Sequence, residues 1–154
     1  MSELRRARRR PCASCPYRRG VPSGVWAADE YEKLPRYDVD TAYQPWHVFE
    51  CHQGDGAICA GWLACHGPYD LLGVRIGVAT GTVHPSVTEF STDVEVFGSG
   101  AEAAAHGVAE IDCPSPEAID TVSKILRLRP DVVVDTLNRS GSTGSTTDRD
   151  RAAE

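Results

Sequence analysis

The sequence predicts a single, mainly α-helical domain with many irregular loops, of a small α or α+β class. Its 154 residues are enough for one domain of ordinary size. Apolar residues recur at helical spacing in several segments, whereas strand-like alternation is brief. Fourteen Gly and ten Pro, against three Phe and one Met, indicate a small core with many loops. Such a core benefits from a staple, and six cysteines could supply one as disulfides or as metal ligands.

Composition divides the chain into three parts. Residues 1–10 are rich in arginine and predict a basic, flexible arm. Residues 11–137 hold the cysteines and the apolar periodicity, and we expect them to form the domain. Residues 138–154 are a low-complexity run of Ser, Thr, Gly and Arg, which predicts a disordered tail.

Start and stop signals place the expected elements within the domain. Ser23 is the expected N-cap of a helix that ends before Pro35. Residues 69–79 combine strand-like and helical spacing, and we favour a helix because no partner strand is evident. Residues 88–97 fit a short strand or an extended connection. Later helices are expected to begin after Ser99, which forms a capping-box pattern with Glu102, and at Pro116.

The sequence favours a cytoplasmic protein. The first ten residues contain no apolar stretch of the kind found in secretory signals. No segment approaches the roughly 20 apolar residues that span a bilayer, so no membrane partner is expected. Thiols stay reduced in the cytoplasm, where clustered cysteines more often bind metal than pair as disulfides.

The net charge of −6 conceals an asymmetry. Residues 1–20 carry seven Arg and one Glu, whereas the remainder carries nine basic and twenty-one acidic side chains. A basic arm on an acidic body favours contact with nucleic acid or the transcription machinery through the arginines of residues 5–10. The alternatives are a solvated tail and an arm that folds back onto the acidic domain.

Five cysteines in the first 65 residues carry the main chemical signal. A C-x2-C pair, such as Cys12 and Cys15, can turn both sulfurs toward one centre, and thiolates prefer soft metals. Two cysteines cannot complete such a site, so the other ligands must come from residues 51–66. We expect four ligands, with three possible substitutes. The expected ligands are Cys12, Cys15, Cys51 and Cys59, and the substitutes are Cys65, His52 and His66.

The spacing favours an iron–sulfur cluster, of the [4Fe–4S] type, and leaves zinc as the alternative. Zinc sites commonly use two closely spaced ligand pairs, but Cys51 and Cys59 are separated by seven residues. Iron–sulfur proteins tolerate irregular spacing, and a proline often follows a ligand cysteine, as Pro16 follows Cys15. Cys113 lies far along the chain and is expected to be a bystander.

Several motifs together resemble a known family. They are Pro11-Cys-Ala-Ser-Cys-Pro-Tyr-Arg18, Pro22-Ser-Gly-Val-Trp26, Tyr31-Glu-Lys-Leu34, Phe49-Glu-Cys-His-Gln53, Cys59-Ala-Gly-Trp62 and Ser99–Gly107. The chain resembles an uncharacterised cysteine-motif family, a domain of unknown function, of actinobacteria and their phages, over residues 11–130. The resemblance implies a shared metal-type site at Cys12, Cys15, Cys51 and Cys59. Cys65 has no counterpart in the family motif.

The sequence therefore predicts an iron–sulfur protein, either redox-responsive or associated with nucleic acid or transcription. The alternative is a structural zinc module that binds partners without redox chemistry. The phosphate-binding loops G-x-G-x-x-G and G-x4-G-K-[ST] are absent from the sequence, so no nucleotide-dependent enzyme is expected. A thiol enzyme or an electron carrier is a weaker third reading, so catalysis is not the expected role.

Overall fold

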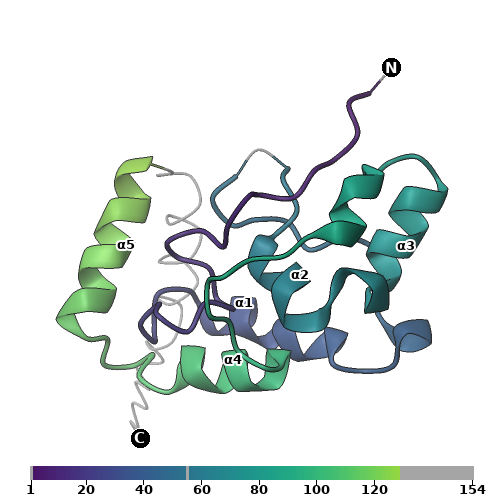
Figure 1. Ribbon diagram of the computed structural model, residues 1–154. Coiled ribbons are helices and arrows are strands. Elements are labelled where there is room, and N and C mark those ends of the chain that lie inside the picture. The colour runs from purple at the N-terminus through teal and green to yellow at the C-terminus, as the bar shows by residue number, and fades with distance from the viewer. Residues whose placement is uncertain (1, 55, 129–154) are drawn as a thin grey trace, which may run out of the picture.

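The computed structural model describes residues 2–54 and 56–128 as a mainly helical domain with irregular loops (Figure 1). Within these ranges there is no strand, only isolated pairs of bridged residues. The helical class is thus confirmed for the described residues, and strand content of the α+β kind is not observed there. The α-helices are α1 (Ala28–Glu32), α2 (Ala60–His66), α3 (Leu72–Ala79), α4 (Gly100–Val108) and α5 (Pro116–Leu128). The 3₁₀ helices are η1 (Leu34–Tyr37), η2 (Thr41–Tyr43), η3 (Pro68–Asp70) and η4 (Pro85–Glu89).

Helix α2 lies at the centre of the domain, with α3 and α5 on opposite sides of it in Figure 1. Its residues Trp62 and Leu63 are fully buried. The core around them is largely built from loops, because the helices are short. Its other large, fully buried side chains include Tyr17, Tyr31, Leu34, Ile58, Leu71, Val74 and Val87.

Helices α1 and α4 pack closely because α4 carries a glycine where they meet. A Cβ atom added to Gly107 would overlap the ring of Tyr31, a buried residue of α1. On the same side of the domain, the Ser23 hydroxyl donates to the Gly107 carbonyl at 2.9 Å. The same hydroxyl accepts a hydrogen bond from the Glu110 backbone N–H at 2.9 Å. These contacts join the N-terminal loop to the end of α4.

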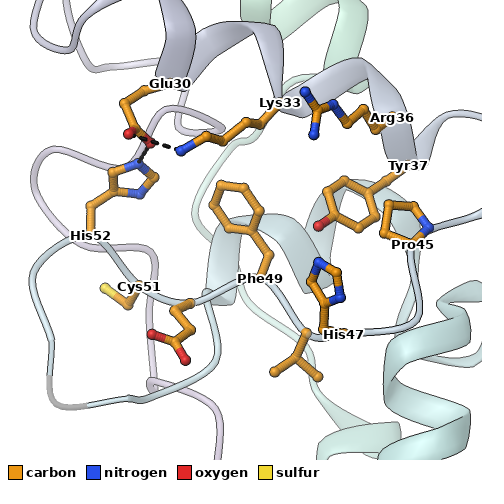
Figure 2. A pocket seen from close by; sticks show the side chains of 11 residues that line it. Glu30, Lys33, Arg36, Tyr37, Pro45, His47, Phe49, Cys51 and His52 are labelled. Atoms are coloured by element: carbon orange, nitrogen blue, oxygen red, sulfur yellow. Dashed lines mark hydrogen bonds and ion pairs between the residues drawn. The ribbon is translucent and has the colours of Figure 1, made fainter.

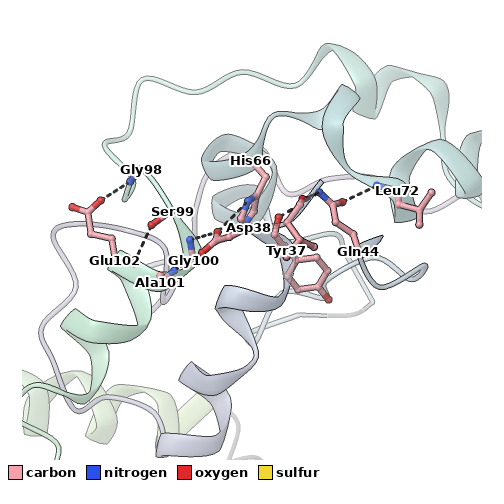
Figure 3. A network of polar contacts seen from close by, with 11 residues as sticks. Tyr37, Asp38, Gln44, His66, Leu72, Gly98, Ser99, Gly100, Ala101 and Glu102 are labelled. Carbon is pink, nitrogen blue, oxygen red and sulfur yellow. Dashed lines mark hydrogen bonds and ion pairs between the residues drawn. The ribbon is translucent and has the colours of Figure 1, made fainter. Parts of the chain in front are cut away.

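Helix α4 is capped from a distant part of the chain (Figure 3). The Asp38 carboxylate accepts hydrogen bonds from the backbone N–H groups of Gly100, at 2.6 Å, and Ala101, at 2.7 Å. Ser99, which the sequence predicts as the N-cap, accepts from the Glu102 N–H at 3.1 Å. Helix N-termini leave such N–H groups without partners inside the helix, so both carboxylate and hydroxyl stabilise this end.

The segment predicted to be a flexible arm lies along the domain. The Arg5 N–H donates to the Thr82 carbonyl at 3.0 Å, and the Arg8 N–H donates to the Ile58 carbonyl at 3.1 Å. The Ile58 N–H donates in return to the Arg6 carbonyl at 2.9 Å. Residues 5–8 are therefore hydrogen-bonded to segments that are far away in sequence. The predicted disordered tail, residues 138–154, lies outside the described residues.

The first predicted helix is shorter than expected, and its predicted cap is wrong. Helix α1 begins at Ala28, and Ser23 uses its hydroxyl to join the loop to α4. Gly24, with φ of +79°, breaks any helical start near Ser23. The helix begins only after Trp26, whose side chain is buried in the core.

The later predictions agree better with the structure. The choice of a helix over a strand within residues 69–79 is confirmed by α3. The predicted starts of α4 after Ser99 and of α5 at Pro116 are also confirmed. Of residues 88–97, the first two end η4 and residues 90–97 form the predicted extended connection, which is bridged to the N-terminal loop through Val96 and Arg18. In the described ranges, no helix has the length and apolar character required to cross a membrane.

Candidate metal centre

The C-x2-C pair lies in a tightly turned loop. The Cys15 N–H donates to the Cys12 carbonyl at 3.1 Å, and the Arg18 N–H donates to the Cys15 carbonyl at 3.0 Å. These two consecutive turns place both sulfurs on the inner side of the loop, where Cys12 is 8% exposed and Cys15 is fully buried. The sequence expectation that this spacing turns two sulfurs inward agrees with this geometry.

The second pair is brought together by a small antiparallel turn. The Cys51 N–H donates to the Ala57 carbonyl at 2.8 Å, and the Cys59 N–H donates to the Phe49 carbonyl at 2.9 Å. Glu50 and Ile58 form an antiparallel bridge between these two bonds. Seven intervening residues thus become the turn of a hairpin-like loop, which explains how a wide sequence spacing gives neighbouring side chains.

The four cysteine sulfurs meet in one row. Cys51 contacts Cys12, Cys12 contacts Cys15, and the Cys15 and Cys59 sulfurs lie 3.8 Å apart. In the described residues, no set of three or more His, Cys, Asp and Glu side chains already has an arrangement that could hold a metal ion. The sulfurs therefore form an open chain of neighbours, and binding of one centre by all four requires the two ends of the row to turn inward.

N–H groups donate to two of the four sulfurs. The Trp62 backbone N–H donates to the Cys59 sulfur at 3.5 Å, at the start of α2. The Arg8 guanidinium donates to the Cys51 sulfur at 3.7 Å. Hydrogen bonds of this kind favour the charged form of a sulfur, which is the form that binds metal. The surroundings therefore suit thiolates that share a cation.

The pKa values of three thiols in the row are raised. For Cys12, contact with Cys15 raises the pKa, although contact with Cys51 opposes this effect. For Cys15, contact with Cys12 lowers the pKa, but contact with Cys59 and burial outweigh it and raise the pKa well above its ordinary value. For Cys51, contact with Cys12 and then burial raise the pKa. Neighbouring thiolates repel one another in a poorly solvated site, so deprotonation is unfavourable there. The positive charge of a bound cation would offset this repulsion and stabilise the thiolate form of its ligands.

An aromatic and apolar wall surrounds the sulfurs. The Trp26 indole N–H donates to the Ser14 carbonyl at 2.7 Å, inside the C-x2-C loop. The Phe49 ring stacks with the Trp62 ring at a centroid distance of 6.4 Å. Helix α2 approaches the C-x2-C loop so closely that a Cβ atom on Gly61 would overlap the Cys15 sulfur. The packing leaves room for sulfur but not for an additional methyl group.

The three predicted substitutes lie outside the row of sulfurs. His52 directs its Nε2 toward the Glu30 carboxylate at 3.0 Å, and its ring lies against Trp26. His66 directs its Nδ1 toward Asp38 at 3.7 Å, and burial lowers its pKa despite this carboxylate. Burial, with Asp38 and Glu102 nearby, raises the pKa of Cys65 to about 12.

The predicted bystander, Cys113, is exposed on the way into α5. The structure thus brings together the four cysteines named first by the sequence and leaves the remaining cysteines and both histidines apart.

The ion pair beside the site gives the domain an acid-dependent stability. The hydrogen bond from His52, helped by Lys33, lowers the pKa of Glu30 to about 2. Because the carboxylate is favoured in the folded state, its stabilisation is complete above its ordinary pKa of 4.5 and is lost as the pH falls toward 2. We expect Glu30→Gln to lower the free energy of unfolding at pH 7 by at most about 3 kcal/mol.

Urea unfolding from pH 7 to pH 2.5 measures this difference. The gap between the wild type and Glu30→Gln should shrink as the pH falls below 4.5. Glu32→Gln, an exposed neighbour on α1, is the control. A gap that stays constant across this range would show that the carboxylate charge is not what stabilises the domain.

Sequence reasoning missed several residues around the row of sulfurs. Arg8 falls in the segment that the sequence predicts to be a flexible basic arm, yet its guanidinium reaches Cys51. Ser14 and Gln53 join the two cysteine loops through a side-chain hydrogen bond of 2.7 Å. Gly61 permits the close approach of α2. The position of Ser14 between the paired cysteines was a usable signal, whereas the roles of Arg8 and Gly61 depend on contacts between distant segments.

These observations define a small helical domain with four buried cysteines that meet from two loops at its centre. Residues 7–129 match the model of a family of unknown function, DUF6283, and the chain belongs to this family. No curated protein matches the chain, and no solved structure matches it either. The resemblance to an uncharacterised family is thus confirmed, while the distribution in actinobacteria and phages stays a prediction.

Proposed function

We propose that the chain is a metal-binding protein whose Cys12, Cys15, Cys51 and Cys59 hold one thiolate-ligated centre. The observation that carries this proposal is the meeting of four buried thiols in one row, from segments separated by more than 30 residues. Packing in an apolar core does not require four thiols to be neighbours, whereas a soft cation can bind all four as thiolates. Such a centre would tie the N-terminal loop to the 49–59 turn and stabilise the domain.

The sulfur separation favours a single zinc ion. A tetrahedral zinc site with Zn–S bonds of about 2.3 Å places its sulfurs about 3.8 Å apart. This agrees with the 3.8 Å between the Cys15 and Cys59 sulfurs. In this proposal, the remaining sulfurs close around the ion by side-chain rotation, and the centre acts structurally in an interaction module without redox chemistry.

An iron–sulfur cluster is the second candidate. In a [4Fe–4S] cluster each cysteine binds a different iron, so the sulfurs lie farther apart than around one ion. The row must then widen, and the tight approach of Gly61 to Cys15 opposes that movement. The aromatic wall of Trp26, Phe49 and Trp62 favours this candidate, because a cluster is commonly surrounded by such side chains. With a cluster, the protein would be redox-responsive.

One anaerobic purification from cells supplied with iron and zinc separates the candidates. Zinc, iron and acid-labile sulfide are quantified on the same sample, and its visible spectrum is recorded. We expect about one zinc per chain and a colourless protein. A brown protein with iron and sulfide would establish the second candidate. A chain without either metal under these conditions would reject the proposed centre.

Arg8 is expected to tune this centre without binding the metal. Its hydrogen bond to Cys51 offsets negative charge on that sulfur, and groups in this position commonly change metal affinity by about 10–100-fold. Arg8→Ala should therefore weaken metal affinity by about tenfold in competition with a chromogenic chelator. Arg9→Ala, an exposed neighbour, is the matched control, and equal affinities for the two variants would remove Arg8 from this role.

We further propose that the exposed part of the basic segment contacts nucleic acid. Arg6, Arg9 and Arg10 are exposed, and Arg10 makes only a solvent-exposed ion pair with Asp93 at 3.7 Å. Arg5, in contrast, pairs with Glu50 at 2.8 Å and Arg8 faces Cys51. Three outward arginines would bind phosphates with a strong salt dependence. Replacing all three by Gln should weaken binding to single- and double-stranded oligonucleotides and lower the salt slope by about one per arginine. If the wild type binds neither at low salt, the contact does not exist.

A further inference from the structure

A cleft of about 530 Å³ opens beside the cysteine row (Figure 2). One side is formed by residues 30–37, which include Lys33 between α1 and η1 and Arg36 within η1. The other is formed by the 45–52 segment, which supplies His47 and ends near Cys51. Its size falls in the range of small-molecule sites in proteins, about 300–1,000 Å³.

The charges of this cleft leave a positive excess. Glu30 is bonded to both Lys33, at 2.9 Å, and His52, at 3.0 Å. Glu50 is bonded to Arg5 at 2.8 Å. Both carboxylates that line the cleft are thus compensated by the protein itself. A ligand that enters the cleft therefore meets no unpaired negative side chain from its lining residues.

Arg36 is the cation that remains for a ligand. Among the described residues, it has no hydrogen bond or ion pair, and it lies at the rim formed by η1. His47 stands across from it in Figure 2, also without a polar partner in the described part of the chain. A guanidinium recognises a carboxylate or phosphate with two parallel hydrogen bonds, so this pair of residues suits an oxyanion.

Flat apolar groups lie between the two polar rims. In Figure 2 the Tyr37 ring lies between Arg36 and His47, the Phe49 ring lies beside it, and the Tyr37 hydroxyl points toward the space between Phe49 and His47. The Tyr37 and Phe49 rings are packed edge to face at 5.9 Å, which fixes both. Pro45 completes the lining beside Tyr37. Aromatic and proline surfaces favour a planar ring, which packs against them and displaces water.

We infer that this cleft binds a small organic anion in which a carboxylate or phosphate group is attached to a planar ring. The anionic group would lie between Arg36 and His47, and the ring would pack against Phe49 and Tyr37. The site is separate from the sulfurs, although Cys51 lies on its border, so its occupancy does not require the metal centre to be of either proposed kind.

The test titrates the full chain, with its metal content measured, by calorimetry and by amide NMR shifts. AMP and benzoate each combine a ring with an anion, whereas adenosine offers the ring alone and inorganic phosphate the anion alone. We expect AMP or benzoate to bind more tightly than either partial probe and to shift amides in residues 30–37 and 45–52. Tighter binding of AMP assigns a phosphate ligand, and tighter binding of benzoate assigns a carboxylate.

Substitutions of Arg36, at the exposed rim, test whether the probes bind in this cleft. Arg36→Gln should weaken binding of the better probe by about tenfold or more, since it removes a charge-assisted contact. Arg36→Lys should weaken it less, and Arg127→Gln, an exposed arginine on α5, should leave it unchanged. The inference is overturned if no probe shifts the cleft amides at millimolar concentration, or if Arg36→Gln binds as tightly as the wild type.

Discussion

Cys15→Ser is expected to abolish metal binding and to lower the free energy of unfolding by more than about 4 kcal/mol, in the range reached when a structural metal is lost. Cys15 is fully buried and contacts both Cys12 and Cys59, so it occupies the middle of the row of sulfurs. A serine hydroxyl has nearly the same size but is a poor ligand for a soft metal. The effect is therefore chemical rather than steric.

Metal analysis and denaturant unfolding of matched samples measure this result. Cys113→Ser is the control, because this cysteine is exposed and far from the row. Wild-type protein stripped with a chelator should unfold with the same reduced stability as Cys15→Ser, and restored metal should rescue only the wild type. Full metal content and normal stability in Cys15→Ser would reject the four-cysteine centre.

Gly61→Ala is expected to disrupt the same centre through α2, the helix that packs against the Cys15 loop. An added Cβ atom would overlap the Cys15 sulfur and approach the Cys15 loop again at the Tyr17 Cβ, at 2.9 Å. Neither neighbour is the free end of a flexible chain, since Tyr17 is fully buried. The helix must therefore move away from the loop. We expect a loss of about 1–3 kcal/mol in stability and a marked drop in metal affinity.

Gly20→Ala is the matched control, because a Cβ atom at Gly20 meets no other atom within 4 Å. Thermal unfolding and chelator competition on the two variants measure the difference. Alanine is the better helix former, so propensity alone would make Gly61→Ala more stable. A stabilised Gly61→Ala protein with unchanged metal affinity would contradict the close approach of α2 to the cysteine loop.

The sequence predictions agree with the structure where they depend on interactions between residues close together in the chain. Ser99 and the segment at Pro116 carry local capping chemistry, and the helices begin where those signals stand. Ser23 carries the same kind of signal, but the positive φ of Gly24 and the contacts of the Ser23 hydroxyl with α4 override it. Local signals thus succeed where no distant segment competes for the same residue.

The basic N-terminal segment shows that local sequence also fails to predict the environment of charged side chains. Seven arginines in the first twenty residues indicate a solvated, basic segment. The structure divides their roles, because backbone hydrogen bonds to Ile58 and Thr82 turn Arg5 and Arg8 toward the domain. Charge counts along a chain do not specify which side chains face outward.

The sequence by itself determined the helical class, the family and the four cysteines that lie next to one another, because these depend on residue types, their spacing and local capping. Only the tertiary structure decided that Cys51 and Cys59 become neighbours through a seven-residue turn, and that their row is bordered by Arg8 and Gly61. It also decided that the two carboxylates of the neighbouring cleft are compensated, while Arg36 has no ion pair among the described residues. The physical reason is that each of these features depends on contacts between segments distant in sequence, whose approach is set by packing of the whole core.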